Sequence, residues 1–282
     1  MQERTLPVLG AGGFRKLAYT EWGRAGEGRR TLICVHGLTR TGRDFDVLAE
    51  ALSDRWRVIC PDVAGRGKSD WLPEAALYDF PLYMADMAAL IARLDVDQVD
   101  WLGTSMGGLI GLFLAAQPGS PIRRLVLNDV GPKLASGALA RISAYVGYRP
   151  VFQDIAAGEA HFRQVHAPFG QLTDAQWRHL AETSLRQVAG GYEFHYDPKI
   201  GQRFAQAPEK DVNLWPFWQM VTCPVLAIRG AQSDLLEAET LRAMAESKPG
   251  LCQTLEIPGC GHAPALMSPD RIEPIRNWLA GS

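Results

Sequence analysis

Ser105 lies between two glycines in the stretch Gly103-Thr104-Ser105-Met106-Gly107. The apolar run before it is typical of a buried strand, and the apolar segment after it is typical of a helix. A serine at such a turn is held in a strained backbone that projects its hydroxyl from the sheet, and the glycines relieve the crowding. The pentapeptide alone also occurs by chance in glycine-rich turns, but this context predicts a nucleophile.

A serine hydroxyl is a weak nucleophile and needs a base that a third group orients. His262 lies in the loop 258–264, between the last expected strand and the last expected helix, at the same sheet edge as Ser105. We therefore predict that His262 is the base. We do not choose His36 as the base, because its presence is better explained by the neighbouring Gly37. The remaining histidines are predicted to be surface or capping residues: His161, His166, His179 and His195.

Two carboxylates could orient His262. Asp234 follows an expected strand that ends at Arg229, and Asp129 ends the strand before it in the sequence. We favour Asp234, because a serine, an acid and a histidine then follow one another in the chain order of this architecture, and Asp129 could cap a turn. Asp129 remains the alternative.

Two backbone N–H groups are candidates to bind a developing negative charge. The N–H of Met106 starts a helix and has no partner within it. Leu38 follows Gly37 after another expected strand, so its N–H can face that of Met106 across a reacting carbonyl oxygen. Leu38 and Met106 are therefore predicted to form an oxyanion hole.

These residues are separated by alternating strand and helix patterns. Apolar runs typical of buried strands begin at Thr31, Arg55, Val99, Arg124, Val225 and Thr254, with helical spacing in most of the intervals between them. This alternation predicts an α/β fold with a mostly parallel central sheet covered by helices on both faces. Gly10 to Gly13 are expected to turn an antiparallel hairpin at the sheet edge.

The interval before Val225 differs from the rest of the chain. It contains capped helical segments but no convincing buried strand. We therefore expect residues 1–131 and 221–282 to form the core, and residues 132–220 to form an inserted helical cap.

The charge of the chain indicates which classes of partner are not expected. Charged residues make up 21% of the chain and the net charge is −2, so nothing favours nucleic acid or an anionic membrane. We find no signal-peptide pattern, and the five cysteines mostly lie in apolar runs, so we expect a cytoplasmic protein. The sequence does not indicate an oligomeric state.

Two patterns could be mistaken for other sites. Gly67-Lys68-Ser69 is similar to the end of a phosphate-binding loop, but Asp62 stands where the first glycine is required. His161 and His166 are five residues apart, which is off one helical face, so no metal site is expected. No cofactor is expected either, because a serine nucleophile needs none.

Together these motifs resemble the α/β-hydrolase superfamily over nearly the whole chain. The resemblance implies that Ser105 attacks an acyl carbonyl, that His262 transfers the proton, that Asp234 orients His262, and that water releases the acyl group. Carboxylic esters are the expected small-molecule substrates. A serine at position 105 argues against the dehalogenase and epoxide hydrolase branches, which use a carboxylate.

Other functions on this fold remain open. Hydrolases that cleave C–C bonds in aromatic degradation, and enol-lactonases, resemble this chain around Ser105. The first group commonly has Asn before the nucleophile and Trp after the histidine, where this chain has Thr104 and Ala263. A non-catalytic ligand receptor on the same fold is the alternative from another class.

Aromatic residues of the insertion are candidates for the substrate pocket, although they could equally fasten the cap to the sheet. They are Tyr145, Trp177, Trp215, Phe217 and Trp218.

Overall fold

A computed structural model describes residues 1–24, 26, 28–203 and 208–281. The strands of its central sheet are β1 (Gln2–Gly10), β2 (Gly13–Trp22), β3 (Arg30–Val35), β4 (Trp56–Pro61), β5 (Val99–Thr104), β6 (Ile122–Asn128), β11 (Val225–Gly230) and β12 (Cys252–Ile257). They are arranged in the order β1-β2-β4-β3-β5-β6-β11-β12. The last six in this order run parallel, and β1 and β2 form the expected antiparallel hairpin at one edge.

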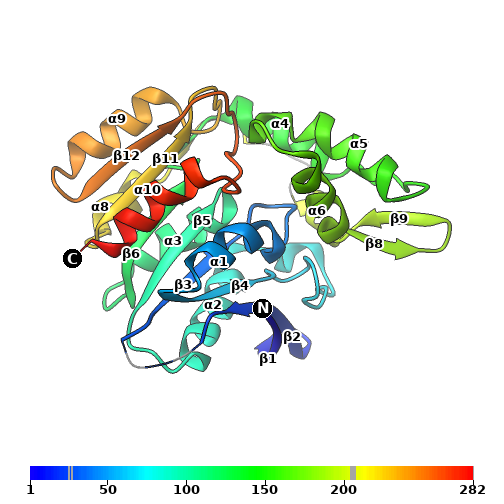
Figure 1. Cartoon of the computed structure of the whole chain (residues 1–282), viewed down its shortest axis with the longest axis horizontal. Helices are drawn as coiled ribbons and strands as arrows, with labels where there is room; N and C mark the ends of the chain where they lie inside the picture. The colour runs from blue at the N-terminus through cyan, green and yellow to red at the C-terminus, as the bar shows by residue number, and fades with distance from the viewer. Residues whose placement is uncertain (25, 27, 204–207, 282) are drawn as a thin grey trace.

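Helices cover both faces of this sheet (Figure 1). Side chains alternate between the faces of each strand, so that Leu32 and Cys34 lie in one apolar cluster and Ile33 and Val35 lie in another. The first cluster includes residues of α1 (Asp46–Leu52) and α10 (Pro269–Ala280). The second includes residues of α2 (Phe80–Arg93), α3 (Met106–Ala115), α8 (Trp215–Met220) and α9 (Ala238–Ser247). The predicted fold class is therefore confirmed.

The segment 132–220 has more strand than the sequence pattern indicated. Its elements besides α8 are β7 (Lys133–Leu134), α4 (Ser136–Val146), α5 (Ile155–Val165), the 3-10 helix η3 (Ala167–Phe169), α6 (Asp174–Ser184), β8 (Leu185–Val188), β9 (Gly191–Phe194), α7 (Lys199–Arg203) and β10 (Val212–Asn213). Two further 3-10 helices, η1 (Gly42–Phe45) and η2 (Ala75–Leu77), lie outside this segment. The strands β8 and β9 pair as a hairpin, and β7 pairs with β10. They are short and largely half-buried, so they show no apolar run of the kind that predicts a core strand.

Helices α4, α5 and α6 lie with the β8–β9 hairpin beyond one end of the sheet (Figure 1). Helices α5 and α6 contribute to a separate apolar cluster, which includes Phe162 of α5, Trp177 of α6 and Met267 of the loop before α10, whereas the buried residues of α4 belong to the main core. Helix α8 packs on α3, and its Trp218 is fully buried in the main core. Among the described residues, the helices are too short or too polar to cross a bilayer.

The junction of β5 and α3 leaves no room for side chains at its glycines. A Cβ atom on Gly107 would overlap the carbonyl oxygen of Val35, and one on Gly103 would overlap the backbone of Gly107. The end of β3, the end of β5 and the first turn of α3 are therefore packed backbone against backbone.

This packing predicts the effect of one added methyl group. Gly107→Ala is expected to lower the free energy of unfolding by about 3 kcal/mol, because the backbone of β3 or α3 must move. The matched control is Gly137→Ala, at an exposed position in the first turn of α4 where an added Cβ meets nothing within 4 Å. It is expected to be neutral or to stabilise by up to about 1 kcal/mol. Urea unfolding measures both, and equal losses would contradict the packing argument.

Candidate active site

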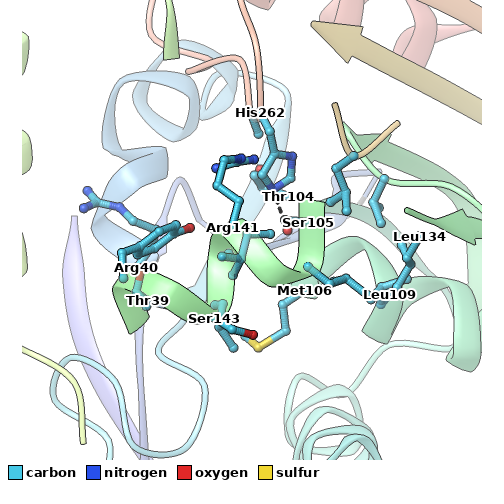
Figure 2. A pocket seen from close by; sticks show the side chains of 18 of the residues that line it. Thr39, Arg40, Thr104, Ser105, Met106, Leu109, Leu134, Arg141, Ser143 and His262 are labelled. Atoms are coloured by element: carbon cyan, nitrogen blue, oxygen red, sulfur yellow. Dashed lines mark hydrogen bonds between the residues drawn. The ribbon is translucent and has the colours of Figure 1, made fainter. Parts of the chain in front are cut away.

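Ser105 occupies the sharp turn between β5 and α3. Its backbone angles are φ 51° and ψ −114°, a region that L residues rarely adopt and that costs about 1–3 kcal/mol. The Ser105 N–H donates to the carbonyl oxygen of Asn128, at 3.0 Å, which ties the turn to the end of β6. The side chain is half-buried and lines a cavity, as Figure 2 shows.

His262 reaches Ser105 from the loop between β12 and α10. Its Nε2 atom lies 3.0 Å from Ser105 Oγ, and its Nδ1 atom lies 2.7 Å from Asp129 Oδ2. A proton on Nδ1 that is donated to Asp129 leaves Nε2 to accept the serine proton. The three side chains thus form one hydrogen-bonded chain, and the expected contact between Ser105 and His262 is present (Figure 2).

Asp129 is fully buried and directly follows β6, the neighbour of β5 in the sheet, and β5 ends just before Ser105. Its Oδ1 atom accepts the N–H of Gly230 at 2.8 Å, and its Oδ2 atom accepts the hydroxyl of Ser233 at 2.6 Å as well as His262. These bonds replace the water that the carboxylate loses on burial. Asp129 is therefore fixed and ready to hold an imidazolium.

Asp234 does not contact His262, and the structure corrects our preference for it as the orienting acid. Its carboxylate accepts Nε and Nη2 of Arg141, both at 2.7 Å, and this interaction holds the pKa of Asp234 below its usual value. Ser233, one residue earlier, turns inward to Asp129, so Asp234 points outward to α4. Chain order could not separate the two acids, since Asp129 also lies between Ser105 and His262.

The loop after β3 lies against Ser105. A Cβ atom on Gly37 would be only 3.8 Å from the Cβ of Ser105. Leu38 and Met106 both line the cavity beside Ser105 and His262, and we find no acceptor for either backbone N–H within the described part of the chain. Both predicted donors therefore belong to the wall of the cavity that contains Ser105, and their joint role as an oxyanion hole stays a prediction.

Two buried side chains fix this loop from behind. His36 Nδ1 donates to the Gly37 carbonyl oxygen at 2.7 Å, and His36 Nε2 accepts the N–H of Val63 at 3.0 Å. Arg66, which the sequence analysis missed, donates from Nε to the Leu38 carbonyl oxygen at 2.9 Å and places Nη2 3.5 Å from Met106 Sδ. The sequence indicated a role for Arg66 only through its place between two glycines in a loop after a strand.

The cavity above Ser105 has a volume of about 520 Å³, within the usual range of small-molecule sites. Its wall is mostly apolar and includes Leu109, Phe113, Leu134, Ile142, Tyr145, Val165, Phe169 and Leu214. Tyr145 therefore lies where the sequence analysis placed it. No group of three metal-ligating side chains is found in the described residues.

The other four aromatic candidates do not line this cavity, which corrects our expectation. Trp218 is fully buried and donates to Ser247 Oγ, and Trp177 packs within the cluster of α5 and α6. Trp215 packs against the main core, and Phe217 is 39% exposed with its ring against Phe113. Large aromatic rings stabilise a fold by burying apolar surface, and these rings bury it in the packing between elements of the fold and not in the cavity wall.

Comparison with known proteins places this geometry in a family. Residues 30–269 match a protein-family model described as alpha/beta hydrolase fold. The chain belongs to the α/β-hydrolase family. A 3-hydroxybutyrate-oligomer hydrolase of Cupriavidus necator is 47% identical over 279 residues, which cover 96% of this chain and 94% of that protein.

Two further similarities cover most of this α/β-hydrolase. A 2-(acetamidomethylene)succinate hydrolase of Mesorhizobium japonicum is 30% identical, over 88% of this chain and 87% of that protein. The crystal structure of an alpha/beta hydrolase from Novosphingobium aromaticivorans superposes with a TM-score of 0.88 at 33% identity, and the match covers 99% of this chain and 97% of that chain.

The contacts of the two acids predict different effects on Ser105 of this α/β-hydrolase. Asp129→Asn is expected to slow labelling of Ser105 by a fluorophosphonate by roughly 10³- to 10⁴-fold, because His262 loses the carboxylate that orients it and stabilises its charge. Asp234→Asn breaks an exposed ion pair and is expected to slow labelling by no more than about tenfold. Mass spectrometry of the labelled protein measures both rates. The reverse order would restore Asp234 as the orienting acid.

Burial of His36 predicts a pH dependence of stability. Burial lowers the pKa of His36 from 6.5 to about 3, against the opposing effect of its hydrogen bond to Gly37. Because the pKa is lower in the folded state, this stabilisation is complete above about pH 6.5 and is lost as the pH falls toward 3.

The neutral control His36→Gln isolates this effect, since every other titrating group is shared. The stability advantage of the wild type over His36→Gln is expected to shrink by about 2 kcal/mol between pH 7 and pH 5. Urea unfolding at the two pH values measures the difference. An advantage that stays constant or grows would mean that His36 is not held neutral by burial.

Proposed function

We propose that this α/β-hydrolase cleaves carboxylic esters through an acyl-enzyme intermediate on Ser105. The observation that carries the proposal is the continuous hydrogen-bonded chain from Ser105 through His262 to the buried Asp129, at 3.0 and 2.7 Å. A nucleophile, a base and an orienting carboxylate in contact are what acyl transfer to serine requires. The orienting acid in this proposal is Asp129, not Asp234.

The proposed steps use the hydrogen-bonded side chains of Ser105, His262 and Asp129. Ser105 Oγ attacks the ester carbonyl carbon while its proton passes to His262 Nε2, and Asp129 stabilises the imidazolium. The N–H groups of Leu38 and Met106 bind the oxyanion. His262 then gives the proton to the departing alkoxide as the C–O bond breaks. Water, deprotonated by His262, then attacks the acyl carbonyl carbon. The bond between this carbon and Ser105 Oγ breaks, the carboxylic acid leaves, and His262 returns the proton to Ser105.

The relative of Cupriavidus necator supports a substrate class. It is named a 3-hydroxybutyrate-oligomer hydrolase, and its similarity extends over 96% of this chain. We propose that short oligomers of 3-hydroxybutyrate are substrates of this chain as well. Such a molecule is a chain of ester bonds with methyl side groups, and the largely apolar cavity of about 520 Å³ suits it.

The segment 132–220 acts in this proposal as a cap over the sheet. Its helix α4 contributes Tyr145 to the cavity wall, while Leu38 and Met106 belong to the core. Core and cap together would then determine which ester enters. Free thiols at all five cysteines support the cytoplasmic, reducing environment expected from the sequence.

Hydrolysis of 3-hydroxybutyrate dimers and trimers and of p-nitrophenyl esters of rising acyl length tests this proposal. The native chain is expected to turn over these esters, and Ser105→Ala is expected to lose roughly three or more orders of magnitude. The matched control is Ser120→Ala in the connection between α3 and β6, at the other end of these elements from Ser105. It is expected to keep the native rate.

Other outcomes would redirect the function. Fluorophosphonate labelling of Ser105 without ester turnover would favour a lactone or C–C substrate. Absence of both labelling and turnover would refute the serine nucleophile and favour the ligand receptor.

A further inference from the structure

The cavity above Ser105 has charged side chains of one sign. Arginine supplies these charges, from Arg40, Arg141 and Arg203, and among the described residues no Asp or Glu lines the cavity. The rest of its wall is mostly apolar, so the arginines are the groups of the wall that would attract an anion, although water screens the charge of the exposed Arg141. This asymmetry indicates a substrate that carries negative charge of its own.

Arg40 also lines the cavity, and its Nη1 atom is buried with no partner in the described residues, but two aromatic rings cover its guanidinium. It is buried, and its Nε and Nη2 atoms donate to Asp44 at 2.8 and 2.7 Å. Its guanidinium also lies over the rings of Phe162 and Phe169, with centroid distances of 5.1 and 5.8 Å. Arg40 therefore fastens η1 to the helices above it.

Arg141 combines exposure with a fixed orientation. It projects from α4, and Asp234 in the loop after β11 holds it through Nε and Nη2, both at 2.7 Å. Within the described residues Nη1 has no such partner, so it remains available to an oxygen atom in the cavity. Arg141, His262 and Ser105 are among the side chains that line this cavity (Figure 2).

A guanidinium held in this way has lost most of its side-chain freedom before a ligand arrives. Arginine presents its N–H groups as a planar fork, which matches the two oxygens of a carboxylate. Asp234 orients the fork from one side, and the cavity is on the other. The Arg141 side chain is therefore already ordered in the free protein, so that binding a ligand costs less conformational entropy.

We propose that Arg141 binds a free carboxylate of the substrate and that this site selects esters of carboxylate-bearing acids, with Asp234 as a positioning residue. The inference rests on the ester hydrolysis proposed above and specifies its substrate class. An oligomer of a hydroxy acid has one such carboxylate at its end. Anchoring that end in Arg141 places an ester bond at a set distance from it over Ser105, so the site also determines which bond is cleaved.

The test compares two substrates that differ only in charge: the 3-hydroxybutyrate dimer as the free acid, and the same dimer with its carboxylate converted to a primary amide. The native chain is expected to show a kcat/KM for the acid roughly 30- to 100-fold higher than for the amide, as expected for hydrogen bonds to a charged group. In Arg141→Met this ratio is expected to fall to about one, mainly through a higher KM for the acid.

Two variants control for a general effect on the cap. Arg149→Met removes an exposed arginine that is ion-paired with Glu193, away from the cavity, and is expected to keep the native ratio. Arg141→Lys keeps the charge but loses the fork, so an intermediate ratio is expected. Circular dichroism and thermal unfolding show whether each variant is folded.

A second measurement needs no turnover. The 3-hydroxybutyrate anion is expected to slow fluorophosphonate labelling of Ser105 in the native chain and in Arg149→Met, and to have no effect on labelling in Arg141→Met. Labelling that the anion leaves unchanged in the native chain, or equal turnover of acid and amide, would overturn the role of Arg141 while the esterase proposal stands. A chain in which Ser105 is neither labelled nor active would refute the proposed function, and this inference with it.

Discussion

The close approach of three backbone segments is the constraint on which the site depends. Gly107 and Gly103 allow the end of β3, the end of β5 and the first turn of α3 to touch without side chains between them. Because the chain must reverse direction in this space, Ser105 is forced to a positive φ and its hydroxyl is raised above the sheet. The contact between Gly107 and the end of β3 also brings the loop after β3 close to Ser105. The positions of Ser105 and of Leu38 in that loop therefore both depend on this backbone contact.

Burial decides which charged groups belong to this site. Asp129 is inaccessible to water, and its oxygens have hydrogen-bond donors from the backbone of Gly230, from Ser233 and from His262. Arg66 is equally buried, and its guanidinium contacts carbonyl oxygens, the Tyr83 hydroxyl and aromatic rings instead of a carboxylate in the described chain. Both charges are held rigidly because relaxing either one would leave it unsolvated.

Residues of the core and residues of the segment 132–220 both line the cavity, and they contribute different groups to it. The sheet contributes the groups that we propose carry out the chemistry, and their positions depend on strands that are hydrogen-bonded along their length. Helix α4 contributes Tyr145 and Arg141, and the Arg141–Asp234 ion pair connects this helix to the loop after β11. An exposed ion pair adds little stability, so its value here is in orienting a guanidinium at the cavity.

The sequence by itself determined the fold class, the turn at Ser105 and the candidate base His262, because strand periodicity and paired glycines act over a few residues. It could not choose between Asp129 and Asp234. Both follow strands and both fit the chain order, and they are distinguished by their contacts in the structure, since His262 hydrogen-bonds Asp129 while Asp234 pairs with Arg141. The tertiary structure also decided the cavity wall, where three tryptophans expected at the pocket pack elsewhere. Side-chain burial depends on which helices meet in space, and an aromatic ring has the same sequence signature in a pocket and in a packed core.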